Sequence, residues 1–226
     1  MLPIGNHDFN FQYVLDGNII DTVQHMNDIG VIIQSNLKFT IQCTATVKKA
    51  YYVIHNIFTT FKNHEQSFYW KMYTCYVRPI LEYNSQVWSP LLKYSIDRIE
   101  KVQRYFTRRI FQVYVPYSSR LNELKTESLE ERRIKADLIL FFKIYYCMTD
   151  INVTDYYRFT NRSRTNSKQL YVFYSRTDKR KLFWLNRLVK YWNDLPENIV
   201  NILDFRNFKA AITNTVRFNG RGSIYC

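Results

Sequence analysis

The chain has 226 residues, of which 46% are hydrophobic, and it contains only 5 glycines and 5 prolines. This composition excludes disordered and fibrous proteins and predicts one sizeable or two small domains, each with a real core. Lysine and arginine number 32 against 19 acids, so the net charge of +13 attracts polyanions. The first 47 residues hold four acids and one base, so the part of the chain that binds a polyanion is expected after about Thr46.

The sequence carries no sign of a membrane or secreted protein. No segment approaches the roughly 18 to 20 apolar residues that cross a bilayer, and the first ten residues lack the features of a signal peptide. We therefore expect a soluble protein without a membrane partner, located in the nucleus or cytoplasm. The cysteines stand too far apart to close a zinc site, so Cys43, Cys75 and Cys147 are predicted to be buried thiols.

The first 39 residues favour short strands. The runs Phe11 to Leu15 and Asn18 to Val23 flank Asp16-Gly17, a pair that supplies the positive φ angles of a tight hairpin turn. A third run, Asp28 to Ile33, is predicted to extend the same sheet.

From about Thr40 the pattern becomes helical. Pro79 lacks a backbone donor and predicts a kink or a stop in its helix. The clearest amphipathic helix is predicted over Ser95 to Val113. Its apolar residues recur at steps of three or four: Ile96, Ile99, Val102, Phe106, Ile110 and Val113.

A capping box, Ser128 to Glu131, predicts the start of a helix that carries Ile134, Leu138 and Phe141 on one side. Later helices are expected over Leu182 to Trp192 and from Asp204 to about Ile212. The predicted fold is therefore mainly α. Its parts are a β-hairpin at 1–39, a helical domain at 40–150 and a basic C-terminal extension at 151–226.

Basic side chains gather in three places that could hold nucleic acid. These are the pair Lys48 and Lys49, the helix predicted over Ser95 to Val113, and residues 158–190. Lys101, Arg104 and Arg108 share one side of the amphipathic helix, because each residue turns the helix by about 100°. The residues predicted to contact nucleic acid are Lys48, Lys49, Arg98, Lys101, Arg104, Arg108, Arg109, Arg162, Arg164, Lys168, Arg176, Lys179, Arg180 and Lys181. The alternatives are an ordinary solvated helix face and, for residues 158–190, a flexible solubilising loop.

Residues 158–190 contain ten bases and one acid. Such a segment repels itself unless a polyanion neutralises it. Tyr171, Phe173 and Tyr174 interleave with these bases as rings on which bases of nucleic acid could stack. Trp88, Trp184 and Trp192 are assigned instead to helix packing.

Three strings are more specific than composition: YVRPILEYNSQVWSP (residues 76–90), IEKVQRYFTRRI (99–110) and LVKYWNDLPENIV (188–200). In this order and spacing they resemble the region downstream of the polymerase core in reverse transcriptases of non-LTR, LINE-like retrotransposons. The resemblance covers roughly Asp28 to Ile212. It implies that the N-terminal strands are the end of a palm and that the helices form a thumb, which grips the template and primer duplex.

The catalytic part of such an enzyme is absent from this sequence. Two-metal phosphoryl transfer needs clustered carboxylates, and the chain has no Asp-Asp pair. Its adjacent acids, Glu130 and Glu131, are assigned to a helix start. No histidine spacing or glycine-rich phosphate loop suggests another active site. No cofactor is expected in this chain, and magnesium only if a palm lies upstream.

The sequence thus predicts a non-catalytic part of a retrotransposon RNA-directed DNA polymerase that binds RNA, DNA or their hybrid through basic helices. An upstream palm is a possible partner. Because the chain opens with Met1 and lacks a palm, a truncated element copy without selected function is an alternative. A protein-interaction scaffold, in which exposed aromatic rings dock a partner, is another.

Overall fold

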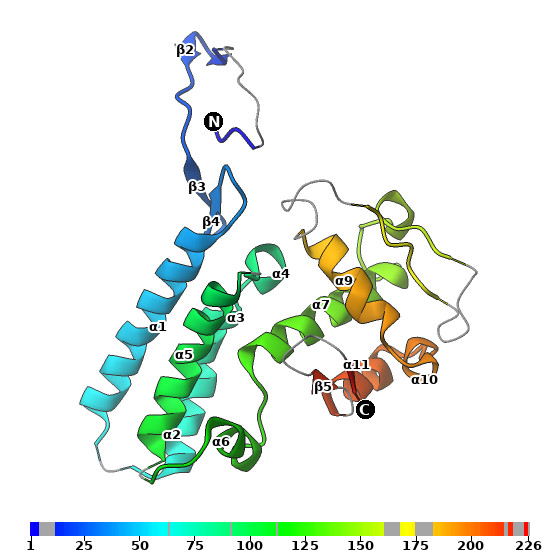
Figure 1. Cartoon of the computed structure of the whole chain (residues 1–226). Coiled ribbons are helices and arrows are strands. Elements are labelled where there is room, and N and C mark those ends of the chain that lie inside the picture. The colour runs from blue at the N-terminus through cyan, green and yellow to red at the C-terminus, as the bar shows by residue number, and fades with distance from the viewer. Residues whose placement is uncertain are drawn as a thin grey trace. The chain divides into compact units, whose positions relative to one another are not determined.

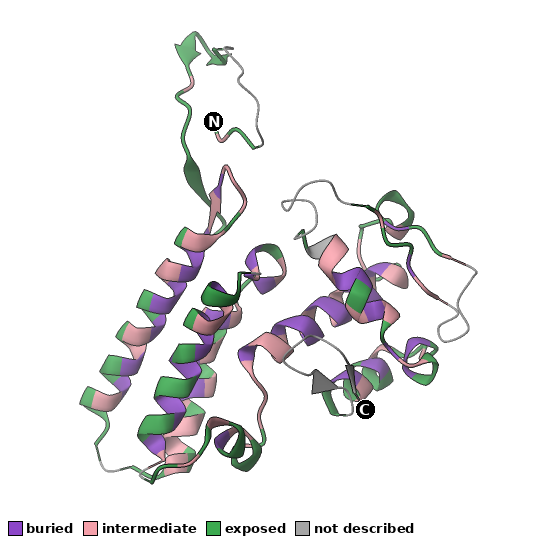
Figure 2. Ribbon diagram, in the orientation of Figure 1, coloured by how far each residue is buried: buried purple, intermediate pink, exposed green. Residues whose placement is uncertain are grey.

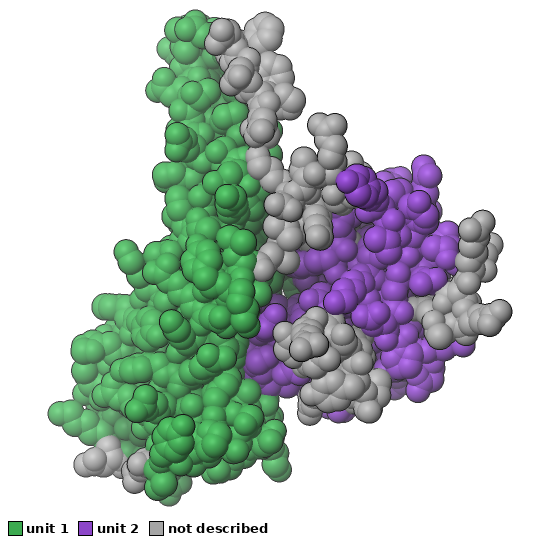
Figure 3. Space-filling view, in the orientation of Figure 1, with its two compact units in different colours: residues 1–126 green, residues 127–226 purple. Residues whose placement is uncertain are grey.

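The computed structural model describes residues 1–4, 12–62, 64–90, 92–111, 113–160, 168–174, 183–214, 217–218 and 224–225, with backbone only at 184–185, 217–218 and 224–225. The chain is mainly helical, with a small antiparallel hairpin near its N-terminus, as predicted (Figure 1). It divides into two compact units, Met1–Thr126 and Glu127–Cys226 (Figure 3).

The first hairpin forms where the sequence places it. Strands β1 (Val14–Leu15) and β2 (Asn18–Ile19) pair antiparallel. The turn residues Asp16 and Gly17 have φ angles of 49° and 77°. Two consecutive left-handed residues match the twist of the flanking strands, which is why the Asp-Gly pair works here.

The predicted third strand is wrong. Strands β3 (His25–Asp28) and β4 (Val31–Gln34) form a second, separate hairpin, whose turn lies inside the predicted run. Gly30 has a φ of 77°, so it supplies another left-handed turn position and reverses the chain. Gln34 then joins this hairpin to the first helix, because its Oε1 accepts from the Ile41 backbone N–H at 2.9 Å.

Unit 1 continues as a helical bundle. Its elements are α1 (Thr40–Thr60), α2 (Gln66–Met72), the π-helix η1 (Tyr73–Val77), α3 (Arg78–Glu82), α4 (Ser85–Trp88), α5 (Lys93–Ile110) and α6 (Tyr117–Glu123). Helices α1 and α5 run side by side (Figure 1). Ile54, Tyr73, Leu81, Trp88 and Phe106 fill the core between the helices. Figure 2 shows the buried residues as stripes along α1 and α5.

Pro79 does not stop its helix. The chain passes from α2 through the wider π-turn of η1 into α3, and Pro79 lies in the first turn of α3. The Arg78 N–H donates to the Tyr73 carbonyl, five residues back, so the helical path stays continuous up to Pro79, which has no N–H to donate. The helical path ends instead at Asn84, whose φ is 50°.

Unit 2 is built on one long helix. Its elements are α7 (Leu129–Tyr145), the 3-10 turn η2 (Val153–Asp155), α9 (Trp184–Asn193), α10 (Glu197–Val200), α11 (Phe205–Asn214), β5 (Arg217–Phe218) and β6 (Ile224–Tyr225). Helix α7 belongs to the unit that begins at Glu127, where it packs on α9 and α11. Leu138, Phe141 and Phe142 share one buried cluster with Trp192 and Phe208.

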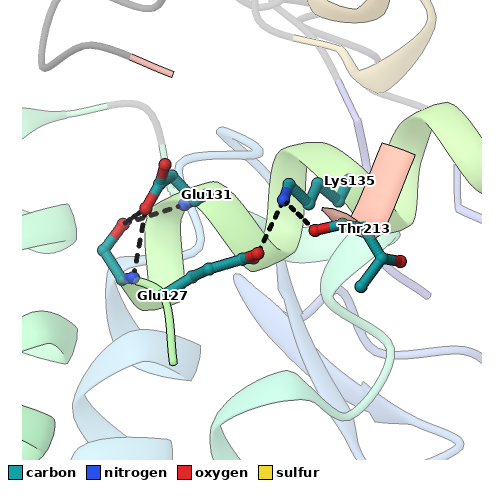
Figure 4. A network of polar contacts seen from close by, with 5 residues as sticks. Glu127, Glu131, Lys135 and Thr213 are labelled. Carbon is teal, nitrogen blue, oxygen red and sulfur yellow. Dashed lines mark hydrogen bonds and ion pairs between the residues drawn. The ribbon is translucent and has the colours of Figure 1, made fainter. Parts of the chain in front are cut away.

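The start of α7 is fixed by the predicted capping box, which is confirmed. The Glu131 N–H donates to Ser128 Oγ at 3.1 Å, and Glu131 Oε2 accepts from the Ser128 N–H at 3.3 Å (Figure 4). One helical turn further on, Lys135 Nζ donates to Glu127 Oε1 at 2.6 Å and to the Thr213 carbonyl at 3.0 Å (Figure 4). Lys135 thereby ties the end of α11 to α7.

Two tryptophans pack as predicted, whereas two cysteines do not. Trp88 and Trp192 are fully buried, and the side chain of Trp184 lies outside the described residues. Cys43 is a buried thiol. Cys75 and Cys147 are exposed, because Cys75 lies on the outer side of η1 and Cys147 in the turn that ends α7. Among the described helices, none has the length and apolar character that crossing a bilayer requires.

Candidate nucleic-acid interface

Helix α5 has a buried side that carries its aliphatic and phenylalanine residues and an exposed side that is rich in cations. Ile99, Val102, Phe106 and Ile110 are buried, as the sequence predicts, whereas Val113 lies beyond the helix and is exposed. The exposed side carries six cations: Lys93, Arg98, Lys101, Arg104, Arg108 and Arg109. At about 100° per residue these span an arc of roughly 160°.

The acids of α5 do little to neutralise this arc. Glu100 is buried. Asp97 pairs with Lys93 at 3.2 Å, one turn away. The other five cations therefore dominate the charge of the exposed side.

Helix α1 borders this arc along Arg98 and Arg109. Arg98 Nη1 donates to Thr44 Oγ1 at 2.9 Å, and the Arg109 guanidinium lies 4.2 Å from the ring centre of Phe58. The rings of Tyr51 and Tyr105 meet edge to face at 5.5 Å.

These contacts decide which lysine of α1 faces α5. Lys48 lies between Thr44 and Tyr51 in one helical row, since residues four and three apart are neighbours on a helix surface. By helical spacing it is therefore the lysine of this pair that lies nearer to the α5 cations. Lys49 is turned away by about 100° and does not join them. We call Lys48, Arg98, Lys101, Arg104, Arg108 and Arg109 the basic face.

Beneath the basic face lies a buried polar network that sequence reasoning missed. Tyr73 OH donates to Gln103 Oε1 at 2.8 Å, and Gln103 Nε2 donates to Tyr117 OH at 3.0 Å. Tyr117 OH donates in turn to Glu100 Oε1. Burial, reinforced by Glu100, raises the pKa of Tyr117. The available signal was the polar residues Glu100, Gln103 and Thr107 at core positions of an amphipathic helix.

The same network fixes α6 and the edge of the basic face. Arg120 Nη1 donates to Thr107 Oγ1 at 2.8 Å and to the Arg104 carbonyl at 3.0 Å. Burial lowers the pKa of Arg120, and the charges of Arg108 and Arg104 add to this. The Arg104 guanidinium lies 5.1 Å from the Tyr117 ring centre. Arg120 thus binds the backbone of Arg104, while the Arg104 guanidinium lies against the ring of Tyr117.

The structure places only one other predicted contact residue. Lys168 belongs to unit 2, where its Nζ donates to Tyr146 OH at 2.8 Å and to the Val200 carbonyl at 3.2 Å, so its ammonium helps to hold that unit together. The remaining predicted residues, Arg162, Arg164, Arg176, Lys179, Arg180 and Lys181, lie outside the described residues. Of the predicted stacking rings, Tyr171 and Tyr174 are exposed and Phe173 is partly covered.

Acidic side chains give no second kind of site in the described part of the chain. No three histidine, cysteine, aspartate or glutamate side chains come together there as metal ligands. Glu131 is occupied by the capping box of α7, as expected, and Glu130 lies in the first turn of the same helix.

Comparison with known proteins adds little to this geometry. No protein-family model matches the chain, and no solved structure matches it. An uncharacterized protein of Caenorhabditis elegans is 26% identical over 113 residues. The match covers 48% of this chain and 57% of the worm protein, so the chain spans little more than half the length of this relative.

Proposed function

We propose that this chain binds RNA, DNA or their hybrid through the basic face of α1 and α5, as the thumb-side, non-catalytic part of a retrotransposon RNA-directed DNA polymerase. Its place of action would be the nucleus or cytoplasm. The observation that carries the proposal is the gathering of six cations on one side of two adjacent helices.

Charge and distance favour a sugar-phosphate chain as the ligand. From Arg98 to Arg109 the helix rises about 16 Å, which lets its cations contact several phosphates of one strand. Phosphate contacts carry no sequence information, so binding should show little preference among base sequences. The resemblance of residues 76–90, 99–110 and 188–200 to retrotransposon enzymes supports template and primer as the nucleic acid.

A salt titration tests the proposal. If all six cations neutralise phosphates of a duplex, log affinity falls with log salt at a slope of about −5.4. The affinity then drops on the order of a thousandfold between 50 and 200 mM salt. Fluorescence anisotropy with a labelled 20-base-pair duplex measures both values. Binding that is indifferent to salt over this range would sink the proposal.

Two neighbouring lysines provide a matched control. Lys48→Gln removes a cation of the basic face and should lower the salt slope by about 0.9. Lys49→Gln makes the same chemical change about 100° away on the same helix and should leave the slope unchanged. Equal effects of the two substitutions would mean that the face defined by the structure is not the binding surface.

The polymerase assignment has its own test. The chain alone, supplied with primed template, nucleotides and magnesium, should not extend the primer, because the metal-binding carboxylates would belong to an upstream palm. Metal-dependent extension by the isolated chain would overturn this part of the proposal.

A second candidate, a protein-interaction scaffold, is favoured by the apolar surface of the two N-terminal hairpins. Leu15, Ile19 and Ile29 are exposed there, Ile29 to 80%. Exposed apolar side chains that lie together mark protein interaction sites. Pulldown from nuclease-treated extract with the wild-type chain and a Leu15→Lys variant tests this function. A protein captured only by the wild type would support it, whereas capture of nucleic-acid-dependent proteins alone would count against it.

A further inference from the structure

Two tyrosine rings interrupt the cations of α5. Tyr94 is 54% exposed and Tyr105 is 42% exposed. Residues 94, 98, 101 and 105 are spaced four, three and four apart, so they form one row along the helix. Arg98 and Lys101 therefore lie between the two rings, within the exposed arc of α5.

Tyr105 is held in place on its inner side. Its ring meets Tyr51 edge to face at 5.5 Å, and its hydroxyl accepts from Arg109 Nη1 at 3.0 Å. A ring that is ordered before binding loses little conformational freedom when a ligand stacks on it.

Duplex and single-stranded nucleic acid would use such a row differently. A duplex presents its sugar-phosphate backbone to a helix surface and keeps its bases stacked on each other. A single strand offers unpaired bases, each with a π-face that can stack on an aromatic side chain while cations hold the backbone. Two rings that flank a pair of cations match the second ligand.

We propose that Tyr94 and Tyr105 make the basic face a platform for single-stranded nucleic acid, on which two unpaired bases stack while Arg98 and Lys101 hold the intervening phosphates. This inference rests on the proposed function and names its ligand. The rings lie 11 residues apart, which is about 16.5 Å along the helix. At a rise of about 3.4 Å per stacked nucleotide, the two bases would be roughly five nucleotides apart.

An abasic strand separates stacking from charge. The full chain is titrated by fluorescence anisotropy against a labelled 20-mer of thymidylate, an abasic 20-mer with the same phosphates, and a 20-base-pair duplex. Wild type should bind the thymidylate strand more tightly than the abasic strand. Tyr94→Leu should weaken thymidylate binding on the order of tenfold, while binding to the abasic strand and the duplex changes less than about twofold.

Three variants complete the design. Tyr105→Leu should weaken thymidylate binding in the same way as Tyr94→Leu. Thermal unfolding checks that the fold survives the loss of the Tyr51 contact. If the Tyr105→Leu variant unfolds, the Tyr94→Leu variant alone tests base stacking. Tyr94→Phe keeps the ring and should retain wild-type binding. Tyr76, exposed on η1 and outside the basic face, is the control, and Tyr76→Leu should have no effect.

Several results would overturn stacking. Equal losses of Tyr94→Leu on the thymidylate and abasic strands would leave only a phosphate contact. A loss in Tyr94→Phe as large as in Tyr94→Leu would assign the effect to the hydroxyl. Equal binding of both strands by the wild type would remove stacking and keep the proposed function. Absence of salt-dependent binding to every ligand would remove the proposed function itself.

Discussion

The ion pair between α7 and α9 gives the sharpest prediction about stability. Asp137 and Arg187 have side chains that are 3% and 9% exposed. Arg187 Nε donates to Asp137 Oδ2 at 2.8 Å, and Arg187 Nη2 donates to Asp137 Oδ1 at 3.1 Å. The perturbation is Asp137→Asn, which keeps the shape of the side chain and removes its charge.

The expected cost follows from burial. Removing one partner of a buried pair leaves the other charge uncompensated and costs about 3–5 kcal/mol. Arg133, also buried, lies within electrostatic range of Asp137, so the substitution deprives two cations of their shared anion. For a unit of about 100 residues, a loss of 3 kcal/mol lowers the melting temperature by at least about 12 °C.

The assay must resolve the two units. Hydrogen exchange of the full chain reports the opening free energy of each helix separately. Amides in α7 and α9 should lose protection in the Asp137→Asn variant, whereas amides in α1 should keep it. Asp150, which is exposed in unit 2, provides the matched control, and Asp150→Asn should change protection by less than about 0.5 kcal/mol.

A compensating variant tests the reasoning further. Asp137→Leu combined with Arg187→Met replaces both charges by apolar groups of similar size, which is often neutral or stabilising. It should recover the part of the lost stability that comes from the unpaired Arg187, whereas Arg133 still lacks its anion. A single variant as stable as wild type, or a double variant no better than the single one, would refute the assignment of the cost to an unpaired buried charge.

Three further predictions concern local structure. Ser128→Ala removes the side-chain acceptor at the start of α7 and should lower the stability of this helix by about 1 kcal/mol. Hydrogen exchange of the amides in the first turn should become faster, and unchanged exchange would contradict the cap. Burial and Glu100 raise the pKa of Tyr117, so the folded state keeps a proton that the unfolded state loses. The contribution of Tyr117 to the stability of unit 1 should therefore be fully present below about pH 10 and decline above it. Urea unfolding at pH 9 to 11 should show a shallower decline of the unfolding free energy for Tyr117→Phe than for wild type. Asn193→Leu removes two hydrogen bonds to the Leu170 backbone, at 2.8 and 2.9 Å, and should cost about 1–3 kcal/mol; a Leu170 amide that exchanges no faster would count against it.

Features that depend on a few neighbouring residues could be predicted from the sequence. The Asp16-Gly17 turn, the capping box at Ser128 and the apolar stripe of α5 all appear as expected, because backbone geometry and helical spacing are local properties. The excess of basic residues after Thr46 is likewise a property of the sequence alone.

Two predictions failed because adjoining residues changed the outcome. Pro79 was expected to kink or stop its helix, but the helical path continues through the π-turn just before it into α3. Gly30 was expected inside a strand, but it lies in the turn of the second hairpin. In both cases the same residue type permits two outcomes, and the surrounding structure selects one.

The candidate site shows the same division. The sequence by itself determined that α5 carries one basic side, because helical spacing fixes which of its residues share a side. Only the tertiary structure decided that Thr44 of α1 meets Arg98 of α5, which makes Lys48 rather than Lys49 the nearer lysine by helical spacing, and that Lys168 serves the core of unit 2. The physical reason is that the packing of α1 on α5 fixes the rotation of each helix about its axis, and contacts between residues far apart in the chain set that rotation.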